Sequence, residues 1–340
     1  MRISSLVALL LLGVIGPTLA GCYYGHLASG QTRVLWARKS VRDVLEDPET
    51  SAELRAKLLR VQAARTYAAG LGLDVEGQYT SYVPWEGDRI VTSLVVSEPG
   101  RVAARPFTFP LIGSVPYKGF FDQARAEAEA ETFRRQGMDV CLIAVPAYST
   151  LGFFDDPLTD PMLAGGDGRV VETVIHELVH ATVFVKSQPE FNEGVADFIG
   201  EEGSIRFFAD DPELAEARRS EVADGRMLAR VQMELREEIT KLYEQELTPG
   251  ERARQRAELE NATRTRLAAL SLRTWDAARL AERVRLNDAC LALRGAYVSD
   301  TPRHALVLES LDGDLVRFVE RLRGVAQDDD PRASFFDLRE

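Results

Sequence analysis

A glutamate between two histidines, in the run HELVH at residues 176–180, constrains the fold of this chain more than any other stretch. If residues 170–185 form a helix, His176 and His180 lie one turn apart on one face, because residues i and i+4 are neighbours on a helix. Two imidazoles placed in this way can bind one metal ion, and zinc accepts both imidazole nitrogen and carboxylate oxygen. The stretch therefore predicts a metal-binding helix, and another part of the chain has to supply a third ligand.

Glu193 is the best candidate for the third ligand. It lies thirteen positions after His180, beyond a predicted turn at residues 186–189, where a second helix can start and fold back on the first. Catalytic zinc sites have three protein ligands and keep a fourth position for water. We therefore expect one zinc ion bound by His176, His180 and Glu193.

Two further acids have roles that follow from this arrangement. Glu177 is next to a ligand but points off the metal-binding face, so it can take a proton from zinc-bound water, whose pKa the ion lowers to roughly 7. Asp197 lies four residues after Glu193, on the same helix face. It can accept the free ring N–H of a zinc-bound histidine and fix the tautomer of that ring. Glu177 is thus the predicted general base and Asp197 a supporting residue.

The alternative is an ordinary amphipathic helix whose histidines are packed or solvated. The chain has only 4 histidines, and two of them fall within five residues around a glutamate. The run NEGVAD at residues 192–197 follows at a workable distance. The two runs together favour the metal site over the ordinary helix.

These runs resemble the gluzincin metallopeptidases, and more closely a bacterial family of predicted zinc aminopeptidases that are lipoproteins. The matching stretches are residues 21–24, 29–31, 116–122, 146–157, 176–180, 191–193 and 286–289. The resemblance covers nearly the whole chain, and it implies a zincin-like fold, bound zinc and removal of N-terminal residues from peptides. One departure is Asp288, at a position where the family is expected to carry asparagine.

The start of the chain looks like a secretory signal. Residues 3–20 carry no charge, but their apolar core is too short for a membrane span and is broken by Gly-Pro at 16–17. The run LAGC at 19–22 resembles the bacterial lipoprotein processing box, which would make Cys22 the acylated first residue of the mature protein. We therefore expect a lipid-anchored protein of the bacterial cell envelope that faces the periplasm or the exterior. The alternative is plain secretion with a spare cysteine.

Charge and cysteine content exclude other classes. The net charge of −12 argues against nucleic acid, whose phosphates require a basic surface. The 3 cysteines are too few and too scattered for a disulfide framework or a thiolate zinc site. Cys141 is most simply a core residue of a buried strand, and the sequence leaves open whether it pairs with Cys290.

The predicted fold is α+β and mostly helical, a zincin-like metallopeptidase with a small antiparallel sheet and a long helical hairpin. Two helices are expected within 23–69, and further helices at 121–136, at 170–185 and after 189. Strands are expected within 79–113 and at 140–146. A long helix at 227–247 and the next one, running from 249 towards 284, form the hairpin. Its charged surface is read as a solvated face, or alternatively as an arm that binds a protein partner.

The expected organisation is a signal peptide at 1–21, a catalytic region at 22–205, a helical region at 206–326 that packs on or near it, and a frayed tail at 327–340. Short helices are also expected at 286–297 and 315–325.

The substrate side of the site is less defined by the sequence. By analogy with zincin folds, the strand at 140–146 and the loop after it form a wall of the cleft. Tyr148 or Tyr117 is a candidate donor to the oxyanion of the reaction, with Tyr148 preferred. The carboxylate that would hold a substrate ammonium group is to be chosen among three acids, Asp155, Asp156 and Glu172.

The predicted function is zinc-dependent hydrolysis of peptide bonds by an aminopeptidase. One alternative is an endopeptidase that acts on envelope proteins or peptidoglycan crosslinks. Another is a lipoprotein without enzymatic activity, in which the zinc is structural and the hairpin binds a partner.

Overall fold

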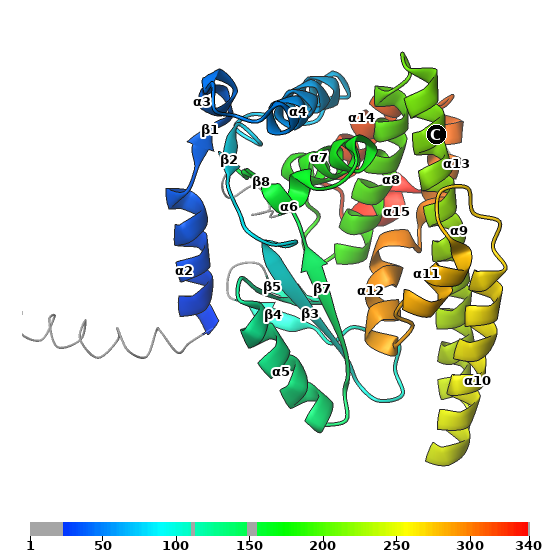
Figure 1. The fold of residues 1–340 in the computed structure, drawn as a ribbon. Helices are drawn as coiled ribbons and strands as arrows, with labels where there is room; N and C mark the ends of the chain where they lie inside the picture. Colours follow the sequence, from blue (N-terminus) through cyan, green and yellow to red (C-terminus); the bar gives the residue numbers. More distant parts are fainter. Residues whose placement is uncertain (1–22, 110–112, 148–154, 339–340) are drawn as a thin grey trace, which may run out of the picture.

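The computed structural model describes residues 23–109, 113–147 and 155–338, and Figure 1 shows their arrangement. The proposed signal peptide 1–21, Cys22 and Tyr148 lie outside these residues. Helices make up most of the described chain, and the strands form small, mainly antiparallel sheets. The α+β, mostly helical class expected from the sequence is confirmed.

The helices are α2 (Tyr23–Trp36), α3 (Val41–Glu46), α4 (Ala52–Gly70), α5 (Gln123–Arg135), α6 (Asp160–Leu163), α7 (Asp167–Thr182), α8 (Pro189–Phe207), α9 (Pro212–Tyr243), α10 (Pro249–Ala268), α11 (Ala277–Arg283), α12 (Asp288–Val298), α13 (Thr301–Ser310), α14 (Leu315–Val325) and α15 (Pro331–Phe335). The strands are β1 (Lys39–Ser40), β2 (Ser81–Val83), β3 (Val91–Ser97), β4 (Phe107–Phe109), β5 (Gly113–Val115), β6 (Lys118–Phe120), β7 (Asp139–Val145) and β8 (Leu158–Thr159). Among the described helices, none combines the length and the apolar character needed to cross a bilayer.

The N-terminal region has three helices where two were expected. One break lies between α3 and α4, where Asp47-Pro48-Glu49 interrupts the helical pattern. The additional break lies before α3, where β1 is extended and pairs with β2. Ser40 ends this strand and accepts a hydrogen bond from the N–H of Arg42, so it also caps α3.

The central sheet has the order β6-β3-β7, and all its strands are antiparallel. Leu94 and Val96 of β3 pack on Ala126 and Ala130 of α5, which covers one face of the sheet. The strand β7 is an edge strand, and Figure 1 shows its C-terminal end pointing towards α6 and α7. The sheet therefore leads directly to the helix that carries the HELVH run.

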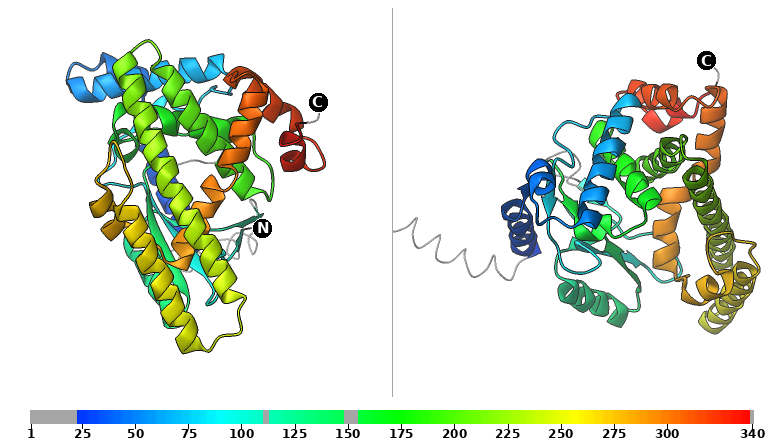
Figure 2. Two further views of the ribbon diagram at one scale, coloured as in Figure 1. Left: turned by 90° about the vertical axis from the view of Figure 1, so that its right-hand side faces the viewer. Right: turned by 45° about the horizontal axis from the view of Figure 1, so that its top comes forward.

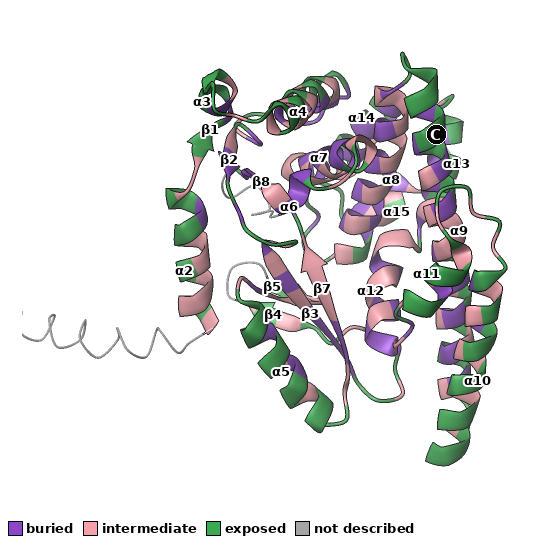
Figure 3. Cartoon of the chain, in the orientation of Figure 1, coloured by how far each residue is buried: buried purple, intermediate pink, exposed green. Residues whose placement is uncertain are grey.

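Helices α7 and α8 form the centre of the molecule, and Figure 3 shows that both are largely buried. Ile175 and Leu178 of α7 and Phe198 of α8 belong to the main core. At Gly200 of α8, a Cβ atom would lie 3.0 Å from the carbonyl oxygen of Glu172 and 3.3 Å from the Cβ of His176. A side chain at this position would push the two helices apart, so glycine permits their close approach.

The helical hairpin is present, with different boundaries. Helix α9 starts fifteen residues before the predicted residue 227, because Asp211 caps it and Pro212 occupies its first turn. Thr248 and Glu251 form a capping box at the start of α10, in agreement with the predicted start of this helix at residue 249. The prediction that this helix continues to Val284 is wrong. Figure 2 shows α9 and α10 as a long pair along one side of the molecule.

Helix α10 ends at Ala268 because the carboxylate of Asp224 holds the chain beyond it in a loop. This carboxylate on α9 accepts hydrogen bonds from the backbone N–H groups of Arg273 and Thr274. A helix that continued through these residues would use those N–H groups for its own backbone bonds. The short helix α11 then starts afresh after its cap, Asp276.

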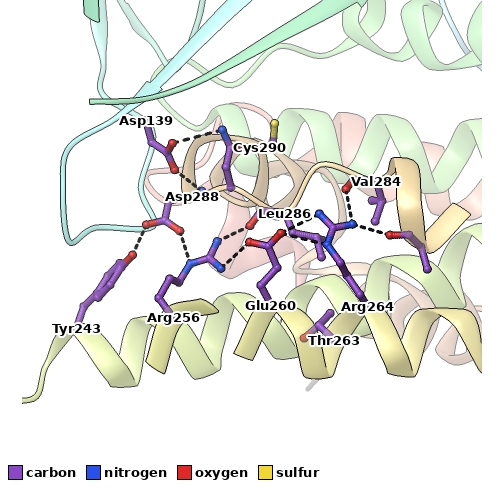
Figure 4. A network of polar contacts seen from close by, with 12 residues as sticks. Asp139, Tyr243, Arg256, Glu260, Thr263, Arg264, Val284, Leu286, Asp288 and Cys290 are labelled. Carbon is purple, nitrogen blue, oxygen red and sulfur yellow. Dashed lines mark hydrogen bonds and ion pairs between the residues drawn. The ribbon is translucent and has the colours of Figure 1, made fainter. Parts of the chain in front are cut away.

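A buried polar network connects the hairpin to the start of α12 (Figure 4). Asp288, which is 6% exposed, accepts hydrogen bonds from Tyr243 of α9 and from Arg256 of α10. Its backbone N–H donates to the carboxylate of Asp139 at 2.7 Å. The acid at position 288 therefore connects the hairpin, α12 and the first residue of β7.

We expect Asp288→Ala to lower the free energy of unfolding by about 2–4 kcal/mol, because Arg256 loses one of its two carboxylates and Tyr243 loses its acceptor. Asp288→Asn retains an acceptor and should cost less. Chemical denaturation measures both changes. The control is Glu258→Ala, whose ion pair with Arg254 leaves both side chains about two-thirds exposed (67% and 66%), and which should have almost no effect. Equal losses in the two alanine variants would contradict this account of the network.

A disulfide between Cys141 of β7 and Cys290 of α12 fixes the same region. Cys141 is buried, as expected from the sequence, and it is also paired. The bridge closes a loop of 149 residues, and loops of this length give large stabilisation in the chain-entropy model. It attaches α12 to the edge strand of the central sheet.

The C-terminal residues form packed structure, so the expectation of a frayed tail at 327–340 is wrong for most of that segment. Asp330 caps α15, and Phe335 is fully buried against Phe191 and Phe318. The three aspartates at 328–330 are typical of a solvated tail that does not pack on the protein. The two phenylalanines that follow them carry enough apolar surface to bind it to the core.

His304 of α13 is fully buried among aromatic rings, and both of its ring nitrogens have no hydrogen-bond partner in the described structure. Burial lowers its pKa to about 3, against a partial opposing effect of Asp300. The folded state therefore holds the neutral ring, whereas the unfolded chain takes up a proton below its ordinary pKa of about 6.5.

Because the folded-state pKa of His304 is depressed, its neutral ring imposes no cost on the folded state above about pH 6.5. The free energy of unfolding should then fall as the pH is lowered from about 6.5 towards 3, because only the unfolded chain takes up the proton. Between pH 6 and pH 4 we expect His304 to account for a loss of about 2–3 kcal/mol. The measurement is urea denaturation of the wild type and of His304→Phe across this range. The variant should lack this part of the pH dependence, and parallel curves would show that His304 does not contribute it.

Candidate metal centre

Three side chains from α7 and α8 bring their donor atoms together. His176 Nε2 and His180 Nε2 lie 3.2 Å apart, and Glu193 Oε2 is 3.6 Å from the first and 3.5 Å from the second. A tetrahedral zinc ion with bonds of about 2.05 Å separates its ligand atoms by about 3.3 Å. The triangle of donors therefore has the size of one face of a tetrahedral zinc site. The structure thus brings together the three residues that the sequence proposed as metal ligands.

Asn192 holds Glu193 at this position. Its side-chain amide, 2% exposed, accepts a hydrogen bond from the N–H of Val185 and donates one to the carbonyl of the same residue. These two bonds tie the start of α8 to the connection that follows α7. Asn192 opens the NEGVAD run beside a candidate ligand, but the run alone does not indicate that its side chain bonds to Val185.

Asp197 lies next to the first histidine. Its Oδ1 is 3.1 Å from Nδ1 of His176, while Nε2 of that ring faces the other donors. A carboxylate in this position selects the tautomer that leaves Nε2 free to bind a metal. Nδ1 of His180 is buried and has no partner among the described residues.

The electrostatics of the group suit a cation. Burial opposes ionisation of Glu193, but His180 and His176 hold the pKa of its carboxyl well below the ordinary value. Burial likewise opposes protonation of His176, whereas Asp197 and Glu193 raise its pKa well above the ordinary value. Both effects arise because carboxylates surround the imidazoles, and a bound cation would satisfy the same charges.

Glu177 faces the same space, with a half-buried side chain. Its charge contributes to raising the pKa of three tyrosines around the centre, Tyr79, Tyr117 and Tyr297, in which burial is the largest cause. The three phenols therefore stay protonated at neutral pH and remain hydrogen-bond donors. The acid proposed as the general base thus lies among phenolic donors, close to the metal-ligand group.

Tyr297 was not identified by the sequence analysis. It is near the end of α12, and its ring is stacked on that of His176 with a centroid separation of 6.4 Å and an interplanar angle of 19°. The helix itself was expected at 286–297, but nothing in its sequence shows that it docks beside α7. The disulfide and the Asp288 network place it there.

The remaining candidates are placed as follows. Tyr117 lies within electrostatic reach of Glu193 and Glu177, and Tyr148 is outside the described residues. Glu172 forms ion pairs with Arg218 and Arg169, so its charge is balanced inside the protein. Of the three acids considered for binding an ammonium group, Glu172 is thus the one whose charge is already paired with arginines.

The fold and the site define an α+β protein with two histidines and a glutamate arranged to bind one metal ion. A model of the family described as "Putative aminopeptidase" matches residues 22–334. The match covers most of the chain, so the protein belongs to this family, which supports a peptidase-like function. No curated protein and no solved structure matched the chain.

Proposed function

We propose that the protein is a zinc-dependent aminopeptidase anchored in the cell envelope. The observation that supports this most is the triangle of His176 Nε2, His180 Nε2 and Glu193 Oε2, with sides of 3.2–3.6 Å, which α7 and α8 form together. Helix α7 also carries Glu177. Nitrogen and carboxylate donors in this number favour zinc over calcium or magnesium, which prefer oxygen ligands. When bound, zinc would polarise the scissile carbonyl and make water more acidic.

The protein's own residues complete the reaction. Glu177 takes a proton from the attacking water and passes it to the leaving amine. Asp197 keeps Nδ1 of His176 engaged, so that this ring cannot turn away from the centre. Either Tyr117 or Tyr297 supplies the phenolic O–H donor to the oxygen that gains negative charge. Tyr117→Phe and Tyr297→Phe would distinguish the two, since the true donor is the one whose loss lowers kcat more than it changes KM.

The envelope location is supported by the apolar start of the chain, by the LAGC run at 19–22 and by the disulfide, which is typical of oxidising compartments. Acylation of Cys22 would anchor the mature protein in the membrane. Cys22→Ser should release the protein into the soluble envelope fraction. Continued membrane association of this variant would contradict the lipid anchor.

Metal analysis and peptide hydrolysis test the activity. Purified protein should contain about one zinc per chain, and His176→Ala should lose it. Peptides with a free N-terminus should be hydrolysed one residue at a time, whereas N-acetylated peptides should not. Hydrolysis of the acetylated peptides alone would support the endopeptidase instead. Absence of hydrolysis in a protein that keeps its zinc would support a structural metal.

A further inference from the structure

A pocket of about 510 Å³ opens beside the metal centre, on the side of Tyr297 and Asp197. We call it the arginine pocket, and its lining includes Ile143, Asp197, Gln232, Arg285, Arg294 and Tyr297. Tyr297 stacks on His176, and Arg294 precedes it by three residues on α12, so the two side chains are neighbours on one helix face. The pocket thus begins next to a proposed metal ligand.

Two of the arginines that line this pocket have no carboxylate partner. The acids of the lining are engaged elsewhere: Glu172 and Glu221 pair with Arg218, Glu201 pairs with Arg226, and Asp197 contacts His176. Arg285 donates to the carbonyl of Leu142, and no hydrogen bond or ion pair of Arg294 occurs among the described residues, although its charge acts to lower the pKa of the nearby Glu201 carboxyl against the larger effect of burial. Their positive charges are therefore available to an anion.

Buried polar atoms in the pocket also lack partners. Oε1 of Gln232, a residue only 7% exposed, and Nε of Arg294 have no hydrogen bond within the described chain. An acceptor and a donor left unsatisfied in this way are costly unless a bound molecule completes them. Both atoms belong to residues of the pocket wall, so this wall has hydrogen-bonding capacity that the described chain does not use.

The free edge of β7 indicates how a peptide would approach. The carbonyl of Val140 accepts a hydrogen bond from Asn287, and that of Leu142 accepts one from Arg285. Backbone groups that point to one edge recur at every second residue, so Ala144 is the next position at this edge. No hydrogen-bond partner for the outward backbone groups of Ala144 occurs in the described structure. A peptide strand can therefore pair at this position, but not beyond it towards Leu142.

The charge of Arg285 selects the direction of that peptide. A peptide antiparallel to β7 would run from Ala144 towards Leu142 and present its C-terminal side to Arg285, whereas a parallel one would present its positively charged N-terminus. The antiparallel direction is therefore favoured. Because the edge is closed at Leu142, only a short stretch of peptide fits between the metal centre and the arginines.

We propose that the arginine pocket receives the C-terminal carboxylate of a short peptide, with one or two residues after the scissile bond. The inference rests on the proposed peptidase function and specifies its substrates. It makes Arg285 and Arg294 specificity residues, which bind the end of the substrate and take no part in bond cleavage. Long peptides and folded proteins are then poor substrates.

The test compares Ala-Ala-Ala with its C-terminal amide, using the purified full-length protein. We expect kcat/KM to be about ten- to a hundredfold higher for the free acid, as for other hydrogen bonds between charged groups. Arg294→Gln should lower the value for the acid to that for the amide, without changing the amide. Arg285→Gln, whose side chain is exposed, gives an independent variant should the first one fold poorly. Arg254→Gln, on the exposed surface of α10, is the matched control.

A binding measurement separates this inference from the proposed activity. Glu177→Gln loaded with zinc should bind the free acid more tightly than the amide by a similar factor, as measured by calorimetry. Equal kcat/KM for acid and amide in an active enzyme would overturn the pocket and leave the peptidase function intact. If the wild type bound the acid preferentially but hydrolysed neither peptide, the pocket would be supported and the peptidase function contradicted. Binding of neither peptide would also overturn the pocket.

Discussion

Glu177→Gln is expected to keep about one zinc per chain and to lower kcat by a factor of about a thousand or more. The substitution removes the group that accepts the proton, while the three donor atoms of His176, His180 and Glu193 stay in place. The amide is similar in size to the carboxylate, and the side chain is only half-buried, so the fold should be unaffected. Substrate affinity should change little, so the loss should appear in kcat and not in KM.

The measurements are metal analysis, thermal melting and steady-state hydrolysis of a peptide with a free N-terminus. Glu213→Gln, which removes an exposed glutamate in the first turn of α9, is the matched control and should keep full activity. A Glu177→Gln enzyme with near wild-type kcat would exclude Glu177 as the general base. Loss of both metal and activity would instead show that the carboxylate helps to hold the ion.

The metal-ligand group was predictable because its geometry is local. His176 and His180 need only one helix, and Glu193 and Asp197 need only the next helix and a short turn, so four positions followed from spacing. Residues of this kind are placed by backbone periodicity, which the sequence shows directly. The exact approach of the two helices depends on Gly200, which has no comparable signal.

Tyr297 and the arginine pocket could not be predicted in this way, because they depend on contacts between distant segments. Helix α12 is placed by a disulfide that links residues 149 positions apart and by the contacts of Asp288 with α9 and α10. From the sequence alone, the pairing of Cys141 with Cys290 was undecided, and Asp288 was recognisable only as a departure from the family. Similarly, the loop after α10 depends on Asp224, about fifty residues earlier, whose carboxylate has no local sign of that role.

Removing a ligand should couple metal loss to stability. An ion that binds only the folded protein stabilises it by RT ln(1 + [Zn]/Kd), which is about 4 kcal/mol at a concentration of a thousand times Kd. We expect the wild type to gain this stability when zinc is added to chelator-treated protein, together with its activity. His180→Ala leaves two donors of the group, so it should show almost no gain and only background hydrolysis.

Thermal melting with and without zinc, and metal analysis after dialysis, measure this difference between the wild type and His180→Ala. His26→Ala is the matched control, because His26 accepts a hydrogen bond from the N–H of Phe121 at 3.0 Å and belongs to another part of the fold. It should melt at a lower temperature than the wild type but show the same rise on adding zinc, since its effect on the fold is independent of the metal. If His180→Ala gained as much stability from zinc as His26→Ala does, the ion would bind elsewhere, and the peptidase proposal would lose its centre.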